Sequence, residues 1–316
     1  MTFTDQANDT GITATEPARK LVRGAYDLHV HVEPDVMSRK ISDLELARRF
    51  RDNGLTGFVL KSHYGSTAER AAVVRAAVPG VDVLGALALN AAVGGMNPLA
   101  VEIAAREDAR VVWMPTVDAL NEPAGRTAPA KDAKLPFWAK MQHELREHGI
   151  ESAPVRVVDE SGTVLPQTRS VLRVIARYDL VLATGHLGRD EIFVLVDAAL
   201  EEGVNHIIIT HPEFPSQSLS AEDQFELAQR GALLERCFTT AHTGKVPWER
   251  LFANMRAVGL EYSVLSTDLG QPTNPPVEDG LPLMADRLLS AGFSEEEVYV
   301  MAVTNSTRLA KGVMMN

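Results

Sequence analysis

From residue 25 onward, short apolar runs alternate along the chain with longer segments of mixed polarity. Some runs, such as Val181-Leu182-Ala183, are apolar throughout, which is typical of parallel strands buried on both faces. We predict eight strands: Ala25–Val30, Gly57–Lys61, Asp82–Leu89, Arg110–Pro115, Leu180–Thr184, His206–Thr210, Ala232–Glu235 and Tyr262–Thr267.

The segments between these runs carry the start and stop signals of helices. Ser42 is placed to cap a helix over Asp43–Asn53, which Gly54 would end. Asn97, followed by proline, would open another helix that continues to Arg106. Strands that alternate with helices predict an α/β fold, here a (β/α)8 TIM-type barrel. The competing fold, an open doubly wound sheet, would need a glycine-rich phosphate loop after the first strand, where this chain has His-Val-Glu-Pro.

One segment, Val117–Tyr178, breaks this rhythm between the fourth and fifth strands. Within it, Asn121–Lys134 has no clear period, Leu135–His148 is predicted to be a helix, and residues 155–165 are predicted to form a β-hairpin. Long barrel insertions lie mostly in the loops at the C-terminal ends of the strands. We therefore expect this segment to cover the barrel mouth as a cap, and we expect no second domain.

Composition narrows the class of partner. The 316 residues carry a net charge of −11, which argues against a nucleic acid or an anionic membrane as partner.

The single cysteine, Cys237, excludes an internal disulfide and fits a reducing compartment, so we expect a cytoplasmic protein. No apolar run reaches the roughly 18 residues of a membrane span. Residues 1–20 are polar and are expected to form a flexible tail rather than a signal peptide, ahead of one barrel domain over residues 21–316. The sequence leaves the oligomeric state open, and a homo-oligomer is compatible with it.

The motif His29-Val30-His31 stands at the end of the first predicted strand. Side chains alternate between the two faces of a strand, so both histidines are expected to point the same way. Two imidazoles on one face can hold a divalent metal. Taken alone, the motif is a weak signal, and two surface histidines on an edge strand would explain it better.

Three later strand ends favour the metal site. Active sites of (β/α)8 barrels are built where the strands end and the loops begin. His186 follows the fifth strand, His211 the sixth and Asp268 the eighth, so these side chains are expected to converge with the HxH motif on one mouth. Each of them alone has a structural alternative, such as a hydrogen-bonded histidine or a carboxylate that caps a turn. Zinc suits a set rich in histidine, while manganese or another divalent ion stays open.

This set resembles the pattern of the amidohydrolase superfamily, which has HxH after the first strand, His after the fifth and sixth, and Asp after the eighth. The chain matches the pattern in order at His29, His31, His186, His211 and Asp268. Residues 304–312 also resemble the family's closing Asn-Pro-Ala-x-x-Leu-Gly helix, with Ser306 where proline is usual. The resemblance covers about residues 24–312 and implies a barrel enzyme with one or two divalent metal ions at its mouth. It says little about the substrate.

The chain departs from that family at the end of the fourth strand, where binuclear members often carry a carboxylated lysine or a glutamate that bridges two metals. The fourth strand here carries neither, which makes a single-metal site credible. The nearest substitute is Lys61, at the end of the second strand and expected to point inward. Lys61 would pair with Asp268 or Glu235, extend its ammonium to solvent, bridge two metals as a carbamate, or bind a substrate carboxylate. We favour a position beside the metal, in contact with Asp268 or substrate. His63 and Glu235 are further candidates for contact with metal or substrate.

A divalent metal with an open position lowers the pKa of its water toward about 7 and polarises a carbonyl or phosphoryl oxygen. We therefore expect hydrolysis of an amide, cyclic amide or ester bond in a small molecule. The resemblance implies that Asp268 both binds the metal and passes the proton of the attacking water to the leaving group. His186, His242 or His63 would stabilise the developing oxyanion.

Other functions remain open on the sequence. A metal-dependent lyase of the same superfamily, such as a decarboxylase, carries the same first-strand and eighth-strand residues. A non-catalytic barrel that serves as a binding module would lack a bound metal. A phosphoesterase of the PHP type also begins with HxH, but it has a seven-stranded barrel. The basic side chains near the predicted mouth that could meet an anionic substrate are Arg39, Lys40 and Arg189.

Overall fold

All the predicted strands form, and they lie side by side in the order of the sequence. The computed structural model describes residues 13–122, 137–151 and 153–312. Each strand pairs in parallel with the next one along the chain. The strands are β1 (Tyr26–Val30), β2 (Gly57–Leu60), β3 (Asp82–Ala88), β4 (Ala109–Trp113), β5 (Val181–Ala183), β6 (His206–Ile209), β7 (Leu233–Cys237) and β8 (Ser263–Ser266).

The sheet closes between the C-terminal ends of β8 and β1. The backbone N–H of Asp268 donates to His29 O at 2.8 Å, and the N–H of His31 donates to Leu269 O at 2.8 Å. An isolated parallel bridge joins Val30 and Leu269. The chain is therefore a (β/α)8 TIM-type barrel, as predicted. The hydrogen bonds that close the barrel lie at the C-terminal ends of β8 and β1, the end at which the catalytic loops of such barrels gather.

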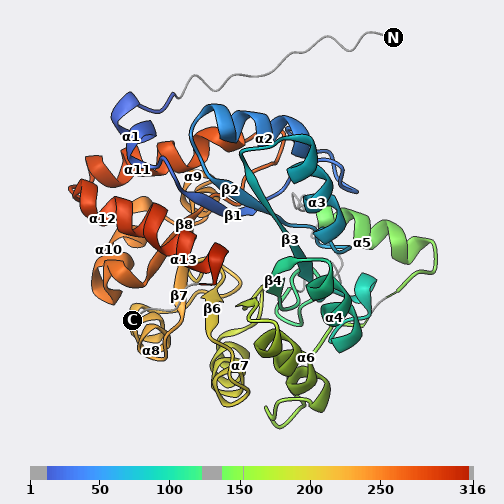
Figure 1. The fold of residues 1–316 in the computed structure, drawn as a ribbon. Helices are drawn as coiled ribbons and strands as arrows, with labels where there is room; N and C mark the ends of the chain where they lie inside the picture. Colours follow the sequence, from blue (N-terminus) through green and yellow to red (C-terminus); the bar gives the residue numbers. More distant parts are fainter. Residues whose placement is uncertain (1–12, 123–136, 152, 313–316) are drawn as a thin grey trace.

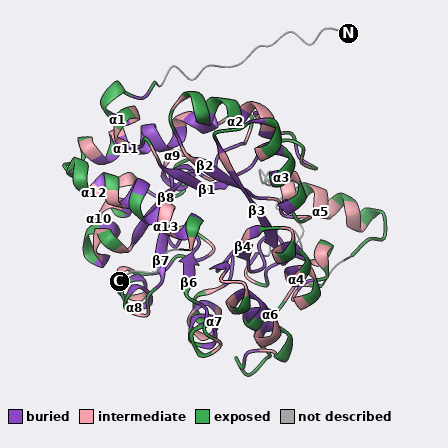
Figure 2. Cartoon of the chain, in the orientation of Figure 1, coloured by how far each residue is buried: buried purple, intermediate pink, exposed green. Residues whose placement is uncertain are grey.

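Helices surround the strands, with their buried faces toward the sheet and their exposed faces outward (Figures 1 and 2). They are α1 (Glu16–Leu21), α2 (Asp43–Asp52), α3 (Ala68–Ala77), α4 (Pro98–Arg106), α5 (Phe137–Glu147), α6 (Pro166–Arg177), α7 (Arg189–Glu201), α8 (Ala221–Gln229), α9 (Phe238–His242), α10 (Trp248–Val258), α11 (Gly280–Ser290), α12 (Glu295–Tyr299) and α13 (Asn305–Lys311). The caps predicted at Ser42 and Asn97 both form. Among the described residues, no helix has the length and apolar character needed to cross a membrane.

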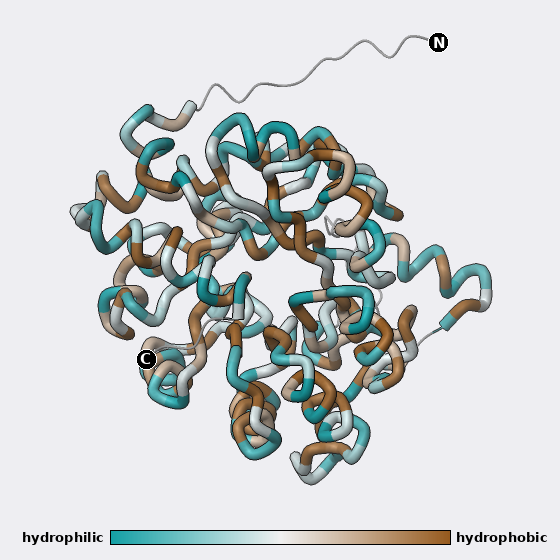
Figure 3. Tube along the Cα trace, viewed as in Figure 1, coloured by the Kyte–Doolittle hydropathy of each residue, from teal (hydrophilic) through white to brown (hydrophobic). Residues whose placement is uncertain are grey.

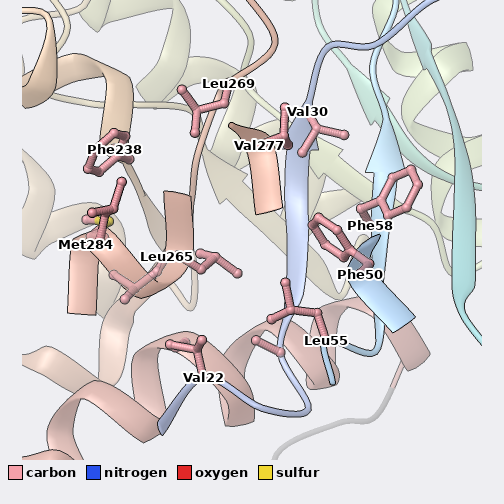
Figure 4. Close-up of a cluster of buried hydrophobic side chains, with 14 of the residues drawn as sticks. Val22, Val30, Phe50, Leu55, Phe58, Phe238, Leu265, Leu269, Val277 and Met284 are labelled. Carbon is pink, nitrogen blue, oxygen red and sulfur yellow. The ribbon is translucent and has the colours of Figure 1, made fainter. Parts of the chain in front are cut away.

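Apolar side chains pack on both sides of the sheet, and Figure 3 marks the hydrophobic positions along the chain in brown. Inside the barrel, every strand contributes to one cluster, which includes Leu28, Val59 and Trp113 and is completed by Leu309 and Ala310 of α13. Outside the barrel, two larger clusters fill the space between strands and helices. Figure 4 shows part of one of them, in which the rings of Phe50 and Phe58 pack with centroids 4.9 Å apart.

Helix α13 is fastened to the ends of the strands opposite the mouth. Asn305 Nδ2 donates to the carbonyls of Ser263 at 2.8 Å and Glu261 at 2.9 Å. Ser306 Oγ accepts the backbone N–H of Tyr26 at 3.0 Å. The serine that stands where proline was expected therefore supplies a hydrogen-bond acceptor at the start of β1.

The predicted tail is wrong at its C-terminal end, because residues 16–20 belong to helix α1. Thr15 caps this helix, its hydroxyl accepting the N–H of Ala18 at 3.3 Å. The N–H and hydroxyl of Thr15 also donate to Asp286 of α11, at 2.7 and 2.6 Å. A helix this short has too few positions to show a period, and Ala18, the side chain that it buries, is small. Residues 1–12 lie outside the described residues.

The insertion after β4 is only partly described. Asn121–Lys134, from its third residue on, lies outside the described residues. The predicted helix forms as α5, while the predicted hairpin is reduced to an isolated antiparallel bridge between Val158 and Val164. Gln142 of α5 donates to Asp118 Oδ1 at 2.8 Å, which attaches this helix to the loop after β4. That the insertion caps the mouth stays a prediction.

Candidate metal centre

His29 and His31 both enter the mouth because β1 changes register near its end. Leu28 belongs to the interior cluster, whereas Val30 packs outside the barrel. The pairing with β2 shifts between Asp27 and Val30, as in a β-bulge. This shift allows two consecutive side chains, Leu28 and His29, to face inward, and alternation then returns His31 to the same side. The two imidazoles lie with ring centroids 5.4 Å apart.

Asp268 meets both imidazoles at the seam of the barrel. Its Oδ1 lies 3.2 Å from His29 Nε2 and 3.1 Å from His31 Nε2, and its Oδ2 accepts the hydroxyl of Thr239 at 3.1 Å. Asp268 has φ 53°, in the left-handed region that non-glycine residues rarely adopt and that often marks functional sites. Burial raises the pKa of Asp268, but His29, His31 and Lys61 lower it by more, so this pKa lies well below its usual range.

His186 and His211 follow β5 and β6 and continue the ring of imidazoles. Their ring centroids lie 5.0 Å apart, and that of His211 lies 6.1 Å from that of His29. Gly185, with φ 61°, turns the chain before His186, and a Cβ there would lie 2.5 Å from Met114 O. His211 itself has φ 26°. Both histidines therefore depend on unusual backbone conformations directly after a strand.

The Nδ1 atoms of these two histidines have different surroundings. Glu122 Oε1 lies 3.0 Å from His186 Nδ1, within ion-pair distance, although the two atoms are not aligned as a hydrogen bond. His211 Nδ1 is buried without a hydrogen-bond partner among the described residues. Burial lowers the pKa of both histidines, that of His211 well below its usual range, so both rings are held neutral. Neutral imidazoles are the form that binds metal.

His63, at the end of β2, is oriented by a buried polar network. Asn90 Oδ1 accepts the N–H of Thr116 at 2.8 Å, which fixes the amide, and Asn90 Nδ2 donates to Thr116 Oγ1 at 2.7 Å. The hydroxyl proton of Thr116 is then free for His63 Nδ1, 2.9 Å away. Burial lowers the pKa of His63 well below its usual range. With the hydroxyl of Thr116 donating to Nδ1, the neutral ring carries its proton on Nε2, and it stacks on His31 with centroids 5.1 Å apart.

Lys61 points into the barrel, as predicted, and is almost fully buried. Its Nζ lies 2.8 Å from His29 Nε2 and 5.1 Å from the centre of the Trp113 ring. Burial lowers the pKa of Lys61, although Asp268 and Glu235 act in the opposite direction. Among the described residues, its nearest polar partner is thus a histidine rather than the carboxylates expected from the sequence.

Glu235 lies beneath His29 in the barrel interior. Its two carboxylate oxygens lie 3.2 and 3.3 Å from His29 Nδ1, and Cys237 Sγ lies 3.7 Å from the same nitrogen. A carboxylate at this position accepts the Nδ1 proton and leaves the lone pair on Nε2, the nitrogen that faces Asp268 and Lys61. Glu235 therefore lies where it orients His29.

The structure thus gathers most of the residues predicted for the site, with one exception. His242 lies on α9, where its ring stacks on Phe238 with centroids 4.7 Å apart and lines a different pocket with Thr15 and Asp286. It is not among the side chains around Asp268, because α9 carries it away from the strand end that precedes this helix.

Several residues near the site escaped the sequence analysis. Glu122 lies inside the insertion, where no pattern marks a buried carboxylate. Asp35 forms a buried ion pair at 2.7 Å with Arg39, which the sequence analysis had already placed near the mouth, and Arg39 Nη2 lies 3.3 Å from His31 Nδ1. Phe214 packs its ring against His211, with centroids 4.8 Å apart. Phe214 stands three residues after His211 in the sequence, and this closeness was the one feature of the sequence that could have pointed to it.

The donor set fits a divalent metal. Donor atoms of His29, His31 and Asp268 all lie within 4.8 Å of one another. Their separations of 3.1 and 3.2 Å from Asp268 Oδ1 match the spacing of about 3.3 Å between two ligands of a tetrahedral zinc ion. His211 Nδ1 has no hydrogen-bond partner among the described residues, so a bound metal or another group from outside the described chain would have to supply one. Lys61 Nζ, which contacts His29 Nε2, must shift when a metal binds that nitrogen.

One family model matches the chain, over residues 24–235, and it is described as a family of unknown function, DUF6282. The matched range includes the HxH motif, Lys61, His186, His211 and Glu235, and it ends before Asp268. A comparison with curated proteins finds no match.

Solved structures share the fold. An amidohydrolase from Pseudomonas aeruginosa is 13% identical, with a TM-score of 0.59 over 93% of this chain and 98% of its own. The probable dipeptidase PvdM from Pseudomonas aeruginosa is 10% identical, with a TM-score of 0.60 over 93% of this chain and 97% of its own. An organophosphorus hydrolase from Deinococcus radiodurans is 16% identical, with a TM-score of 0.55 over 95% of this chain and 99% of its own. At these identities the likeness establishes the barrel fold and nothing about substrates.

Proposed function

This chain belongs to DUF6282, a family of unknown function, and we propose that it is a metal-dependent hydrolase that cleaves an amide, cyclic amide or ester bond in a small molecule. The observation that carries the proposal is the cluster of His29, His31 and Asp268 at the barrel seam, surrounded by His63, His186 and His211. The names of the similar structures, an amidohydrolase, a dipeptidase and an organophosphorus hydrolase, agree with it.

We propose zinc as the metal, with His29, His31, His186, His211 and Asp268 as its candidate ligands. Histidine-rich sets favour zinc, and manganese or another divalent ion stays open. When bound, the metal would supply an activated water and polarise the bond to be cleaved. The single cysteine, Cys237, is free and buried, which supports the expectation of a reducing, cytoplasmic compartment.

Asp268 is proposed as the base. Its Oδ1 faces both histidines of the HxH motif, while Oδ2 is held by the hydroxyl of Thr239. The low pKa of Asp268 keeps the carboxylate ionised at neutral pH, which is the form that both a metal ligand and a base require. The same carboxyl group would then donate that proton to the leaving group.

His63 is proposed to stabilise the developing oxyanion. The network of Asn90 and Thr116 places the proton of His63 on Nε2, so that nitrogen is a donor at pH 7 without a charge. A fixed N–H donor in a buried site needs no reorganisation during the reaction. His186 is a metal ligand in this assignment, because Glu122 lies beside its Nδ1 and leaves Nε2 for the metal.

The test is hydrolysis by zinc-loaded protein of a panel of lactones, cyclic amides and N-acyl amino acids in water enriched in heavy oxygen. We expect one heavy oxygen in the acid product, and loss of turnover after chelation that returns when zinc is added. A product that gains no heavy oxygen and releases carbon dioxide would instead identify the lyase alternative. Absence of any metal effect on turnover would contradict both.

A further inference from the structure

Among the described residues, the cations near the mouth differ in their partners, and Lys40 Nζ donates to the carbonyl of Pro272 at 3.2 Å. Arg39 is paired with Asp35, and Arg189, half exposed at the start of α7, is paired with Asp223 at 2.6 Å. Lys61 contacts His29. In the described part of the chain, no carboxylate lies within ion-pair distance of Lys245, which stands in the loop between α9 and α10. An exposed lysine usually needs no explanation, but the surroundings of this one are unusual.

The ammonium of Lys245 is held over an aromatic ring that belongs to the site. Its Nζ lies 3.9 Å from the centre of the Phe214 ring. The Phe214 ring also packs against His211, with centroids 4.8 Å apart, and against His186, with centroids 6.3 Å apart. One aromatic ring therefore separates Lys245 from two candidate metal ligands.

The charges of the site reach Lys245 without neutralising it. Partial burial lowers the pKa of Lys245, while the negative charges of Asp268 and Glu122 raise it, which places both carboxylates within electrostatic range. Each of those carboxylates already has partners, Asp268 in the HxH histidines and Glu122 in His186 and Ser216. The ammonium remains available to an anion at the rim.

We propose that Lys245 binds a carboxylate of the substrate, at a point remote from the bond that is cleaved, so that the enzyme acts on anionic small molecules. This inference rests on the proposed function. A carboxylate is proposed because Lys245 offers a single point charge, whereas bidentate recognition of a phosphate usually relies on the planar fork of an arginine. A chain of net charge −11 repels anions in general, so a cation at the rim is needed to admit one.

The test measures binding of dicarboxylates from malonate to adipate by calorimetry, each against its half-amide, which has one carboxylate fewer. Zinc-loaded wild type is expected to bind the best dicarboxylate about fivefold more tightly than its half-amide, the range of an exposed ion pair. Lys245→Met should abolish this preference and Lys245→Arg should keep most of it. Lys20→Met, at an exposed lysine on α1, is the matched control and should behave as wild type.

A wild type with no preference for the dicarboxylate, or a Lys245→Met variant that keeps the preference, would overturn the proposal. If Lys245 only holds Phe214 in place, Lys245→Met would weaken zinc binding and lower Tm while both carboxylic ligands lose affinity equally. Failure of the proposed function is seen separately, as an absence of bound zinc. The comparison of dicarboxylate with half-amide on the metal-free protein would then still decide the role of Lys245.

Discussion

Most histidines of the site present one ring nitrogen to its centre because the other nitrogen has a partner outside it. Glu235 lies at His29 Nδ1, Thr116 at His63 Nδ1, and Glu122 at His186 Nδ1. Partners of this kind fix the tautomer and the orientation of a metal-binding imidazole. The site is therefore defined by these partners as much as by the histidines themselves.

Replacing Glu235 with glutamine tests whether the partner at Nδ1 prepares His29 to bind metal. The amide can still accept the Nδ1 proton, but the charge that raises the basicity of the ring is lost. We expect zinc affinity to fall by about 10- to 100-fold, measured by competition with a chelator of known affinity. Cys237→Ser, which alters the other neighbour of the same nitrogen, should change zinc affinity little. A large loss in the serine variant would mean that Cys237 is a ligand.

Asp268→Asn tests the base. The substitution preserves the shape of the side chain and removes both the negative charge and the ability to accept a proton. Turnover should fall by at least about 100-fold, the usual scale of a general-base contribution. Circular dichroism and Tm should show that the fold survives. Near-normal turnover with normal metal content would remove Asp268 from the mechanism.

Lys61→Met separates the roles left open for this lysine. Methionine fills a similar volume beside Trp113 but has no amine. We expect metal content to stay unchanged and turnover to fall, because Lys61 acts beside the metal rather than holding it. A loss of metal on substitution, together with stimulation of wild-type reconstitution by bicarbonate, would instead indicate a carbamate bridge between two metals.

The sequence was sufficient to predict the histidines and the aspartate but not the groups that orient them. His29, His186, His211 and Asp268 each follow a short apolar run, so position at a strand end predicted their convergence. Glu122 comes from a segment without periodicity, and its proximity to His186 depends on a loop path that local pattern does not encode. The same limit explains the misplacement of His242, whose direction depends on the helix that follows β7.

At the scale of elements, the site depends on backbone irregularities at strand ends. β1 contains the register shift that turns His29 inward, and His211 and Asp268 adopt positive φ. Simple alternation along β1 would correctly pair His29 with His31, but it would place both on the opposite face from Leu28. The shared direction of His29 and His31 was predicted. The bulge in β1 that turns them inward was not, because no glycine or proline marks its position in the sequence.

Gly270→Ala tests how closely the backbone of the seam is packed. Gly270 has φ 134°, and a Cβ there would lie 1.6 Å from His31 O, so the loop after β8 must move away from β1. We expect a large drop in Tm together with loss of metal binding. Gly162→Ala is the control, since Gly162 also has positive φ (82°) but has no atom within 4 Å of the added carbon. If both substitutions lowered Tm and metal binding equally, the cause would be the positive φ that the two glycines share, and the close packing at Gly270 would not be the cause.

The strands were more predictable than the connections. Short runs that are mostly apolar identified all the strands to within a few residues, because most positions of these strands are buried in apolar surroundings, although β1 and β7 also bury polar side chains such as Asp27 and Glu235. The short helix α1 gave no such signal, and the hairpin predicted over residues 155–165 forms only the single bridge between Val158 and Val164. Both are stabilised by contacts with distant parts of the chain, which a local pattern does not contain.

At the scale of the whole molecule, the proposed metal joins the first and last strands of the barrel. His29 and His31 belong to β1 and its end, Asp268 follows β8, and backbone hydrogen bonds between the same residues close the sheet. Binding to the folded barrel alone would stabilise it by mass action, so added zinc should raise Tm in proportion to the logarithm of its concentration.

The most direct test of the account is the metal content of the purified chain after reconstitution with zinc and removal of free metal, measured by mass spectrometry of the elements. Wild type and His242→Ala should retain about one zinc or more per chain, and the double variant His29→Ala/His31→Ala should retain none while keeping its fold. A wild type without bound metal, or a double variant that binds as much as wild type, would contradict the proposal that these residues form a metal centre.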